Sequence, residues 1–323
     1  MTDLNYIGDL SFSEFMDTTR HRHPDLADMI DPGRAANIEQ YLSSMNQISW
    51  EFEDHTSGRG AEYNEAQLAT SNRAVGMTRL LQLFSPCGKQ LPGPDAIILD
   101  ALAGDGTVRR FVDGMSLRPE VISADLSAFM VAQCLVQGLP CIRQSADASL
   151  LRDGMLDGVL IAYGSHHLPA AARPAAAAEA SRTLKPGGRF VLHDFEIGGP
   201  VDAWFSQVVH PYSVTGHDHP HFSRPEMHAL MQSAEFADIN VFDVDDPFTL
   251  HGSTADEARC NLLRHLHNMY GLTRLPLATE QDFLCMEDLV VQTLGAFTID
   301  RSKKGWTAHL NRVALVAVGS KPS

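Results

Sequence analysis

The sequence predicts an α/β protein built around a mostly parallel β-sheet that helices cover on both faces. From about residue 96 onward, apolar runs of strand length alternate with helix-length segments, the pattern of βαβ units. The chain has 323 residues, 44% of them apolar and 20% charged, which is the composition of a globular protein with a substantial core. A stretch rich in Pro and Gly, SPCGKQLPGPD, precedes the first apolar run. We therefore expect an N-terminal helical cap over residues 1–88 and a main domain over residues 89–323.

Apolar runs give the expected strands and sequence signals give several helix starts. The expected strands are 96–99, 121–124, 141–144, 158–162, 189–192, 237–244 and 311–319. Pro174 suits the first turn of one helix, and Ser223 with Glu226 forms a capping box that opens another. Roughly sixty-five residues separate the last two strands, too many for a simple loop, and they show helical periodicity. We expect a helical insertion at about 250–308.

Charge and cysteine content limit the partners and the compartment. Forty acidic against twenty-five basic side chains give a net charge of -15, which disfavours binding to nucleic acid. The five cysteines are scattered without a CxxC pair, so a reducing, cytoplasmic location is expected. The N-terminal residues lack the pattern of a signal peptide, and no long apolar run is present. The sequence therefore predicts no membrane association.

The segment AIILDALAGDGT at 96–107 is typical of a nucleotide-binding turn. An apolar strand ends at Asp100, and glycines then open a helix whose first N–H groups are unpaired. Asp125 ends the next expected strand, where an acidic group can accept both ribose hydroxyls, and Asp147 follows the third strand. These three acids predict an adenosine pocket at the carboxyl edge of the sheet. A dehydrogenase is the weaker alternative, because GxGxxG is absent.

Five segments in order, ILDALAGDGT, ISADLS, QSADAS, LDGVLIAYGSHHLP and RTLKPGGRFVLHDFE, resemble the class I S-adenosylmethionine-dependent methyltransferases. The resemblance covers roughly residues 90 to 245 and is closest to the small-molecule subgroup with type 11 or type 25 motifs and a histidine pair after the fourth strand. It implies a Rossmann-like seven-stranded sheet of order 3-2-1-4-5-7-6 with strand 7 antiparallel, here joined to helical cap elements. It also implies S-adenosylmethionine as the cofactor.

The resemblance assigns cofactor roles to positions of this sequence. Asp100 and the glycine loop would contact the methionyl group, Asp125 the ribose, and Leu126 and Asp147 the adenine. The departure from the family pattern is Leu102, where glycine or alanine is usual. The implied cofactor-binding residues are Asp100, Ala101, Gly104, Gly106, Asp125, Leu126, Asp147, Ala148, Ala162 and Tyr163.

Candidate general bases follow the fourth and fifth expected strands. His166 and His167 lie in YGSHHLP, and Asp194 follows His193. Histidine titrates near neutrality and suits proton transfer, and a carboxylate at the end of a strand can point into the cleft. We take His166, His167 and Asp194 as catalytic candidates, with structural packing of the histidine pair as the alternative.

The segment HPYSVTGHDHPHF at 210–222 raises the question of a metal site. It holds His210, His217, His219 and His221 together with Asp218. Four imidazoles and a carboxylate are suitable ligands. Alternating histidines outside a regular element are more often a solvated or hydrogen-bonded loop, so the sequence predicts no metal. A second possible set is His193, Asp194 and His251, and the sequence does not favour it either.

The expected substrate is a small molecule enclosed by the caps. After the fourth expected strand, where methyltransferases that act on nucleobases carry their characteristic motifs, this chain has YGSHHLP instead. The acceptor atom stays open among O, N, C and thioether S, and an amino-acid-like or keto-acid acceptor would require an arginine. The expected substrate-binding residues are Trp50, Arg59, Tyr63, His193 and Tyr212, with Arg224 and Arg264 as further arginine candidates. A homodimer is compatible with the helical arm. The alternative function is a cofactor-binding protein that transfers no methyl group, either a cyclase-like catalyst or a ligand-binding regulator.

Overall fold

A seven-stranded sheet forms the centre of the protein. The computed structural model describes residues 5–38, 40–42, 60–116, 118–303 and 305–323. The strands run in the order β5-β4-β3-β6-β7-β12-β8, and β12 is antiparallel to both of its neighbours. Each expected strand is present, and the order is the one that the resemblance implies. Their bounds are β3 (Ile97–Asp100), β4 (Glu120–Asp125), β5 (Cys141–Arg143), β6 (Leu156–Ile161), β7 (Leu184–Asp194), β8 (Ala237–Asp245) and β12 (Val313–Ser320).

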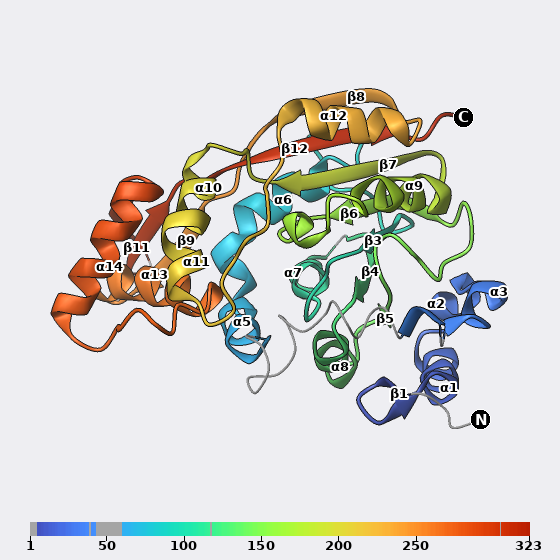
Figure 1. Cartoon of the computed structure of the whole chain (residues 1–323), viewed down its shortest axis with the longest axis horizontal. Coiled ribbons are helices and arrows are strands. Elements are labelled where there is room, and N and C mark those ends of the chain that lie inside the picture. Colours follow the sequence, from blue (N-terminus) through green and yellow to red (C-terminus); the bar gives the residue numbers. More distant parts are fainter. Residues whose placement is uncertain (1–4, 39, 43–59, 117, 304) are drawn as a thin grey trace.

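Helices cover both faces of this sheet (Figure 1). Pro174 stands in the first turn of α9, and Ser223 with Glu226 forms the capping box of α12, so both predicted helix starts are confirmed. Among the residues that the structure describes, no helix is both long and apolar enough to cross a lipid bilayer. The covering helices are α6 (Ala74–Gln82), α7 (Thr107–Asp113), α8 (Ala128–Val136), α9 (Arg173–Thr183) and α12 (Arg224–Ser233).

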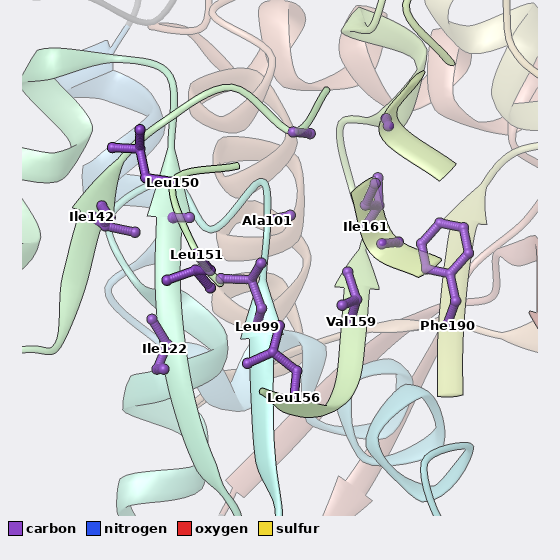
Figure 2. Close-up of a cluster of buried hydrophobic side chains, with 14 of the residues drawn as sticks. Leu99, Ala101, Ile122, Ile142, Leu150, Leu151, Leu156, Val159, Ile161 and Phe190 are labelled. Carbon is purple, nitrogen blue, oxygen red and sulfur yellow. The ribbon is translucent and has the colours of Figure 1, made fainter. Parts of the chain in front are cut away.

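The apolar side chains of the central strands form a continuous core. Leu99, Ile122 and Val159 point from neighbouring strands into one cluster with Leu151 and Phe190 (Figure 2). All five are nearly inaccessible to solvent. Burying a leucine or isoleucine side chain stabilises the fold by about 1.5–3 kcal/mol, so this cluster fixes the register of the strands whose ends form the site.

The N-terminal segment forms more than the expected helical cap. A short hairpin of β1 (Asn5–Ile7) and β2 (Leu10–Ser11) precedes the first helices, and this part lies beside β5 and α8 (Figure 1). The guanidinium of Arg143 donates to the backbone oxygen of Tyr6 at 2.7 Å, which ties the hairpin to the end of β5. The helices are α1 (Phe12–Arg22), α2 (Pro24–Met29), α3 (Pro32–Ala35) and α5 (Gly60–Gln67), followed by the 3-10 helix η2 (Thr70–Arg73). Unlike α1–α3, α5 packs against the late insertion.

The insertion before β12 contains a small sheet besides its two expected helices. The helices are α13 (Ala255–Met269) and α14 (Glu280–Thr293). The strands β9 (Phe248–Gly252), β10 (Thr298–Ser302) and β11 (Gly305–Leu310) form an antiparallel sheet of order β10-β11-β9. Sequence reasoning missed this sheet because β10 is mostly exposed and polar, so it lacks the alternation that marks a half-buried strand.

Candidate functional site

Most of the predicted site residues that the structure describes lie at the carboxyl edge of the sheet, on both sides of the point where the strand order reverses. β3 pairs with β4 on one side and with β6 on the other, so the chain reverses its direction of winding between β3 and β6. In open α/β sheets, ligands bind at such a switch point, outside the carboxyl ends of the strands. We call the side formed by β3, β4 and β5 the cofactor half, and the side formed by β6, β7 and the segments after them the acceptor half.

The glycine loop of the cofactor half has the conformation that its sequence predicts. Gly104 and Gly106 have φ angles of 56° and 85°, in the left-handed region that favours glycine. A Cβ on Gly106 would lie 2.7 Å from the Leu139 side chain and 3.1 Å from Cys134 Sγ, so the loop also packs too closely there for any other residue. Leu102 is half-buried against the core and leaves this conformation intact.

Asp100 is a buried acid without a basic partner. It is 3% exposed at the end of β3, and among the described residues it makes no ion pair. Burial, together with the nearby charge of Asp125, raises its pKa to about 7. A cationic group brought to this position would hold the carboxylate in its charged form. The ammonium of a methionyl group therefore fits the environment of Asp100.

Asp125 fastens the glycine loop to the end of β4. Its Oδ2 accepts from the Gly104 N–H at 2.8 Å and its Oδ1 from the Ser127 N–H at 2.9 Å. Each carboxylate oxygen can accept a second hydrogen bond, as the hydroxyls of a ribose require. Beyond β5, Asp147 is half-buried and accepts from the Ser145 hydroxyl.

The remaining cofactor-half residues predicted from the sequence lie around these acids. Ala101 is buried and its N–H donates to β6, while Leu126 packs at the edge of the core. Ala148 donates its N–H to the Ser145 oxygen at 3.1 Å, which closes the turn that carries Asp147. The structure thus brings together the cofactor-half residues that the sequence singled out.

Across the crevice, Tyr163 follows the end of β6 and Ala162. Its φ angle of 61° is unusual for a residue with a side chain. Its N–H donates to His193 Nδ1 at 3.3 Å, and its hydroxyl to Asp246 Oδ1 at 3.3 Å. His193 is completely buried, and burial lowers its pKa to about 4, so it stays neutral near pH 7. Expected in contact with substrate, His193 instead supports the backbone of Tyr163.

His166 and Asp194 form a buried pair at the ends of β6 and β7. Nδ1 of His166 lies 3.0 Å from both oxygens of Asp194, which also accept hydrogen bonds from the Phe195 N–H and the Ser165 hydroxyl. Burial lowers the pKa of His166. Burial alone would raise the pKa of Asp194, but the interaction with His166 outweighs it and the pKa lies below its usual value. The Asp194 carboxylate therefore binds Nδ1 of His166 and thereby fixes the orientation of the ring and of its Nε2.

The segment after α11 (His210–Tyr212) folds back over this pair. The ring centroid of His166 lies 5.0 Å from that of His217 and 4.8 Å from that of His221, and the His167 centroid lies 4.5 Å from that of His219. Of the two expectations for this loop, solvated or hydrogen-bonded, the second holds for His217 and His221. Both are buried, and they make hydrogen bonds to His210 and Asp202, respectively.

The other members of the two candidate metal sets have separate positions. His210 Nδ1 bonds to the backbone of His217, and Asp218 is exposed. His251 lies on β9 with its Nδ1 3.1 Å from the Thr307 hydroxyl. Within the part of the chain that the structure describes, His193, Asp194 and His251 are not grouped as metal ligands.

The predicted substrate residues have mixed outcomes. Trp50 and Arg59 lie outside the described residues. Tyr63 on α5 approaches the glycine loop, because a Cβ on Gly104 would lie 3.7 Å from its ring. This contact places Tyr63 beside the cofactor half. Tyr212 is half-buried in the short helix α11.

A buried arginine, Arg73, lies beside the site and was not predicted from the sequence. Arg224 is partly exposed and binds Glu196, so it is already paired. Arg73 is 6% exposed and stands 3.8 Å above the ring of Tyr163. Among the described residues it makes no hydrogen bond or ion pair, and its Nε is buried without a partner. Its surroundings in the sequence, ATSNRAV, carry no signal of a site.

The carboxylate near Arg73 is already neutralised. Asp246 is buried and paired with the buried guanidinium of Arg312. This arrangement requires Gly76, because a Cβ there would lie 1.9 Å from Asp246 Oδ1. Two guanidinium groups therefore share one carboxylate, which leaves an excess positive charge beside Tyr163. Such a place favours an anionic ligand group.

Comparison with known proteins identifies the central segment. Residues 99–192 match a family described as a methyltransferase domain. Over 104 residues the chain is 33% identical to a ubiquinone/menaquinone biosynthesis C-methyltransferase of Syntrophotalea carbinolica. The aligned region covers 30% of this chain and 43% of that protein. The match thus spans less than half of the curated relative.

A solved structure supports the fold. The chain is similar to a protein chain in the solved structure of a complex between the Haloferax volcanii Trm112 methyltransferase activator and a methyltransferase. The TM-score is 0.50 and the identity 16%, over 85% of this chain and 98% of that one. S-adenosylmethionine is the cofactor that fits the acids and glycines of the cofactor half.

Proposed function

The central part of this chain is a class I S-adenosylmethionine-dependent methyltransferase domain, and we propose that the protein transfers a methyl group from S-adenosylmethionine to a small metabolite. The observation that carries this proposal is the cofactor half. Within the matched segment, a glycine loop with left-handed glycines adjoins acids at the ends of three neighbouring strands.

The cofactor half can bind each part of the cofactor. Asp100 would face the ammonium, Asp125 the ribose hydroxyls and Asp147 the adenine amino group. When bound, S-adenosylmethionine supplies a methyl group that its sulfonium already activates. The protein then has mainly to position the acceptor, a contribution of about 7–11 kcal/mol in favourable cases.

The acceptor half supplies imidazoles for proton transfer. If the acceptor is a protonated oxygen or nitrogen, His167 is the base that we favour, because it is half-buried beside the crevice while Asp194 holds His166. A neutral imidazole next to an acceptor can take its proton, an effect of about 10²–10⁴-fold in rate. A thioether acceptor has no proton to lose and would require no base.

Arg73 supports a ligand with a carboxylate. Its guanidinium makes no ion pair among the described residues, because the nearby Asp246 is paired with Arg312. It lies on the face of Tyr163, next to the backbone expected to meet the methionyl group. A carboxylate can bind a guanidinium through two parallel hydrogen bonds. That carboxylate could belong to the methionyl end of the cofactor or to an amino-acid-like or keto-acid acceptor, and the two sources are separable by experiment.

Calorimetric titration with S-adenosylmethionine and S-adenosylhomocysteine tests the cofactor pocket, and mass spectrometry of turnover with pooled small metabolites tests the reaction. We expect micromolar binding, and S-adenosylhomocysteine formed in proportion to a methylated product. Binding without transfer over a broad set of metabolites would favour the non-transferring alternative, while no binding would overturn the proposal. With a substrate in hand, full activity of both His166→Ala and His167→Ala would return the pair to a structural role.

A further inference from the structure

The acceptor half contains a buried group of imidazoles that methyl transfer does not require. We define the histidine cluster as His166, which follows β6, together with His217 and His221 from the segment after α11. One ligand atom from each lies within 4.8 Å of the other two. All three residues are at least 94% buried, so the cluster is part of the interior.

Carboxylates hold two of these rings through one ring nitrogen. His166 Nδ1 bonds to Asp194 at 3.0 Å, and His221 Nδ1 to Asp202 at 2.6 Å. A metal-bound histidine commonly donates its second ring N–H to a carboxylate, which fixes the tautomer and leaves the other nitrogen as the ligand. The same arrangement occurs twice here, on rings that face each other.

His221 also has an unpartnered nitrogen. Its Nε2 is buried and makes no hydrogen bond within the described part of the chain. The atom lies 4.0 Å from Asp194 Oδ1, the same carboxylate oxygen that His166 Nδ1 contacts at 3.0 Å. A buried polar atom without a partner costs about 1–3 kcal/mol, and a ligand bound to this nitrogen would remove that cost.

We propose that His166, His217 and His221 bind a divalent transition-metal ion. Three imidazoles without a thiolate suit zinc, cobalt or iron(II), and three protein ligands leave a coordination position open, as in catalytic rather than structural zinc sites. With metal–nitrogen bonds of about 2.0–2.1 Å, tetrahedral ligand atoms lie roughly 3.4 Å apart. The ligand atoms, which lie within 4.8 Å of one another, therefore have to approach by up to roughly 1.4 Å when the ion binds.

The charge around the cluster favours a cation. Among the described residues, the ion-pair partners of Asp194 and Asp202 are histidines alone, with no lysine or arginine beside them. An ionised carboxylate in the interior is costly unless positive charge compensates it. A divalent ion bound to the imidazoles that these carboxylates hold would supply that compensation.

A second group of histidines competes for the same ring. His167, His217 and His219 also offer ligand atoms within 4.8 Å of one another. Both groups use His217, and His167 and His219 are only half-buried. We choose the histidine cluster because its rings are buried and two of them are oriented by carboxylates. His167 then stays available as a base.

Metal titration of the full chain tests the site without any knowledge of the acceptor. After treatment with a chelator, Co²⁺ is titrated while its visible d–d absorption is followed, and Zn²⁺ is then added as a competitor. We expect one ion per chain, a tetrahedral-type spectrum and displacement by Zn²⁺. Elemental analysis of the untreated protein gives an independent stoichiometry.

Variants identify the ligands. His221→Ala and His217→Ala should each weaken binding at least 100-fold, since loss of a second-shell partner alone costs about 10–100-fold. Asp202→Asn should weaken it about tenfold. His228→Ala is the control, because His228 is exposed on α12. Circular dichroism checks the fold of each variant. If the alanine variants unfold, Asp202→Asn still tests the site, because this variant keeps all three imidazole rings.

The outcomes separate the competing explanations. Substoichiometric binding, or equal affinity in the His221 variant and the His228 control, would overturn the metal site and leave the cluster as hydrogen-bonded packing. Loss of binding in His167→Ala and His219→Ala but not in His221→Ala would also refute it in favour of the second group. Failure of methyl transfer has no bearing on these results, because metal stoichiometry is measured without substrate.

Discussion

The two halves of the carboxyl edge present opposite chemistry. The cofactor half offers carboxylates at the ends of three neighbouring strands, within residues 100–147, and one of them is a buried acid with a raised pKa. The acceptor half offers imidazoles with lowered pKa values and a buried arginine, Arg73, whose neighbouring carboxylate is already paired with Arg312. The first half is therefore prepared for positive groups of a ligand, and the second for an anionic group and for proton transfer.

The largest effect that we expect on ligand binding is at Arg73. Arg73→Met should weaken binding of its carboxylate ligand about 100-fold, because removal of one member of a buried charged pair costs about 2–5 kcal/mol. If the carboxylate belongs to the cofactor, the calorimetric affinity for S-adenosylmethionine falls. If it belongs to the acceptor, KM rises while the cofactor affinity is unchanged.

Arg79→Met is the matched control for this variant. Arg79 lies on α6, which begins directly after Arg73, but it is half-exposed and paired with Asp245 at the surface. Surface ion pairs contribute little to stability, so this variant should behave as the parent protein does. Unchanged cofactor affinity and unchanged KM in Arg73→Met would remove the anion site from the acceptor half.

A smaller effect is expected at Asp125 in the cofactor half. Asp125→Ala removes both the ribose acceptor and the acceptor of the Gly104 N–H, so affinity for S-adenosylmethionine should fall at least about tenfold, or 1.4 kcal/mol. Calorimetry measures this change. Asp218→Ala, at an exposed acid of the acceptor half, should leave the affinity unchanged. Equal affinity of the Asp125 variant and the parent would refute the adenosine pocket.

The smallest expected effect is a proton linked to cofactor binding. Between the ordinary pKa of aspartate and about 7, Asp100 is protonated in the folded protein and ionised in the unfolded chain. Its contribution to stability therefore falls as the pH rises through this range. An ammonium brought beside Asp100 favours the carboxylate, so binding at pH 6 should release nearly one proton.

Calorimetry at pH 6 in buffers of different ionisation enthalpy measures this proton release. Asp100→Asn should abolish the release, while Asp147→Asn should retain it because Asp147 is only half-buried and lies beyond β5, away from the expected position of the ammonium. If the parent protein released no proton, Asp100 would not meet a cationic group of the cofactor.

The sequence by itself determined the sheet and the cofactor half. The inner strands are apolar runs. Asp100 and Asp125 end their strands and Asp147 lies four residues beyond β5, so their place at the carboxyl edge depends on local order alone. The left-handed Gly104 and Gly106 were predictable for the same reason, since close approach and positive φ are properties of glycine itself.

Only the tertiary structure decided the acceptor half. His166 and His221 are separated by more than fifty residues of chain and meet because the segment after α11 folds over the end of the sheet. Arg73 follows a polar stretch without any motif, and it becomes part of the site because Gly76 lets its helix approach Asp246 closely. Such contacts depend on how side chains far apart in the sequence pack together, and no local pattern of residues records that packing.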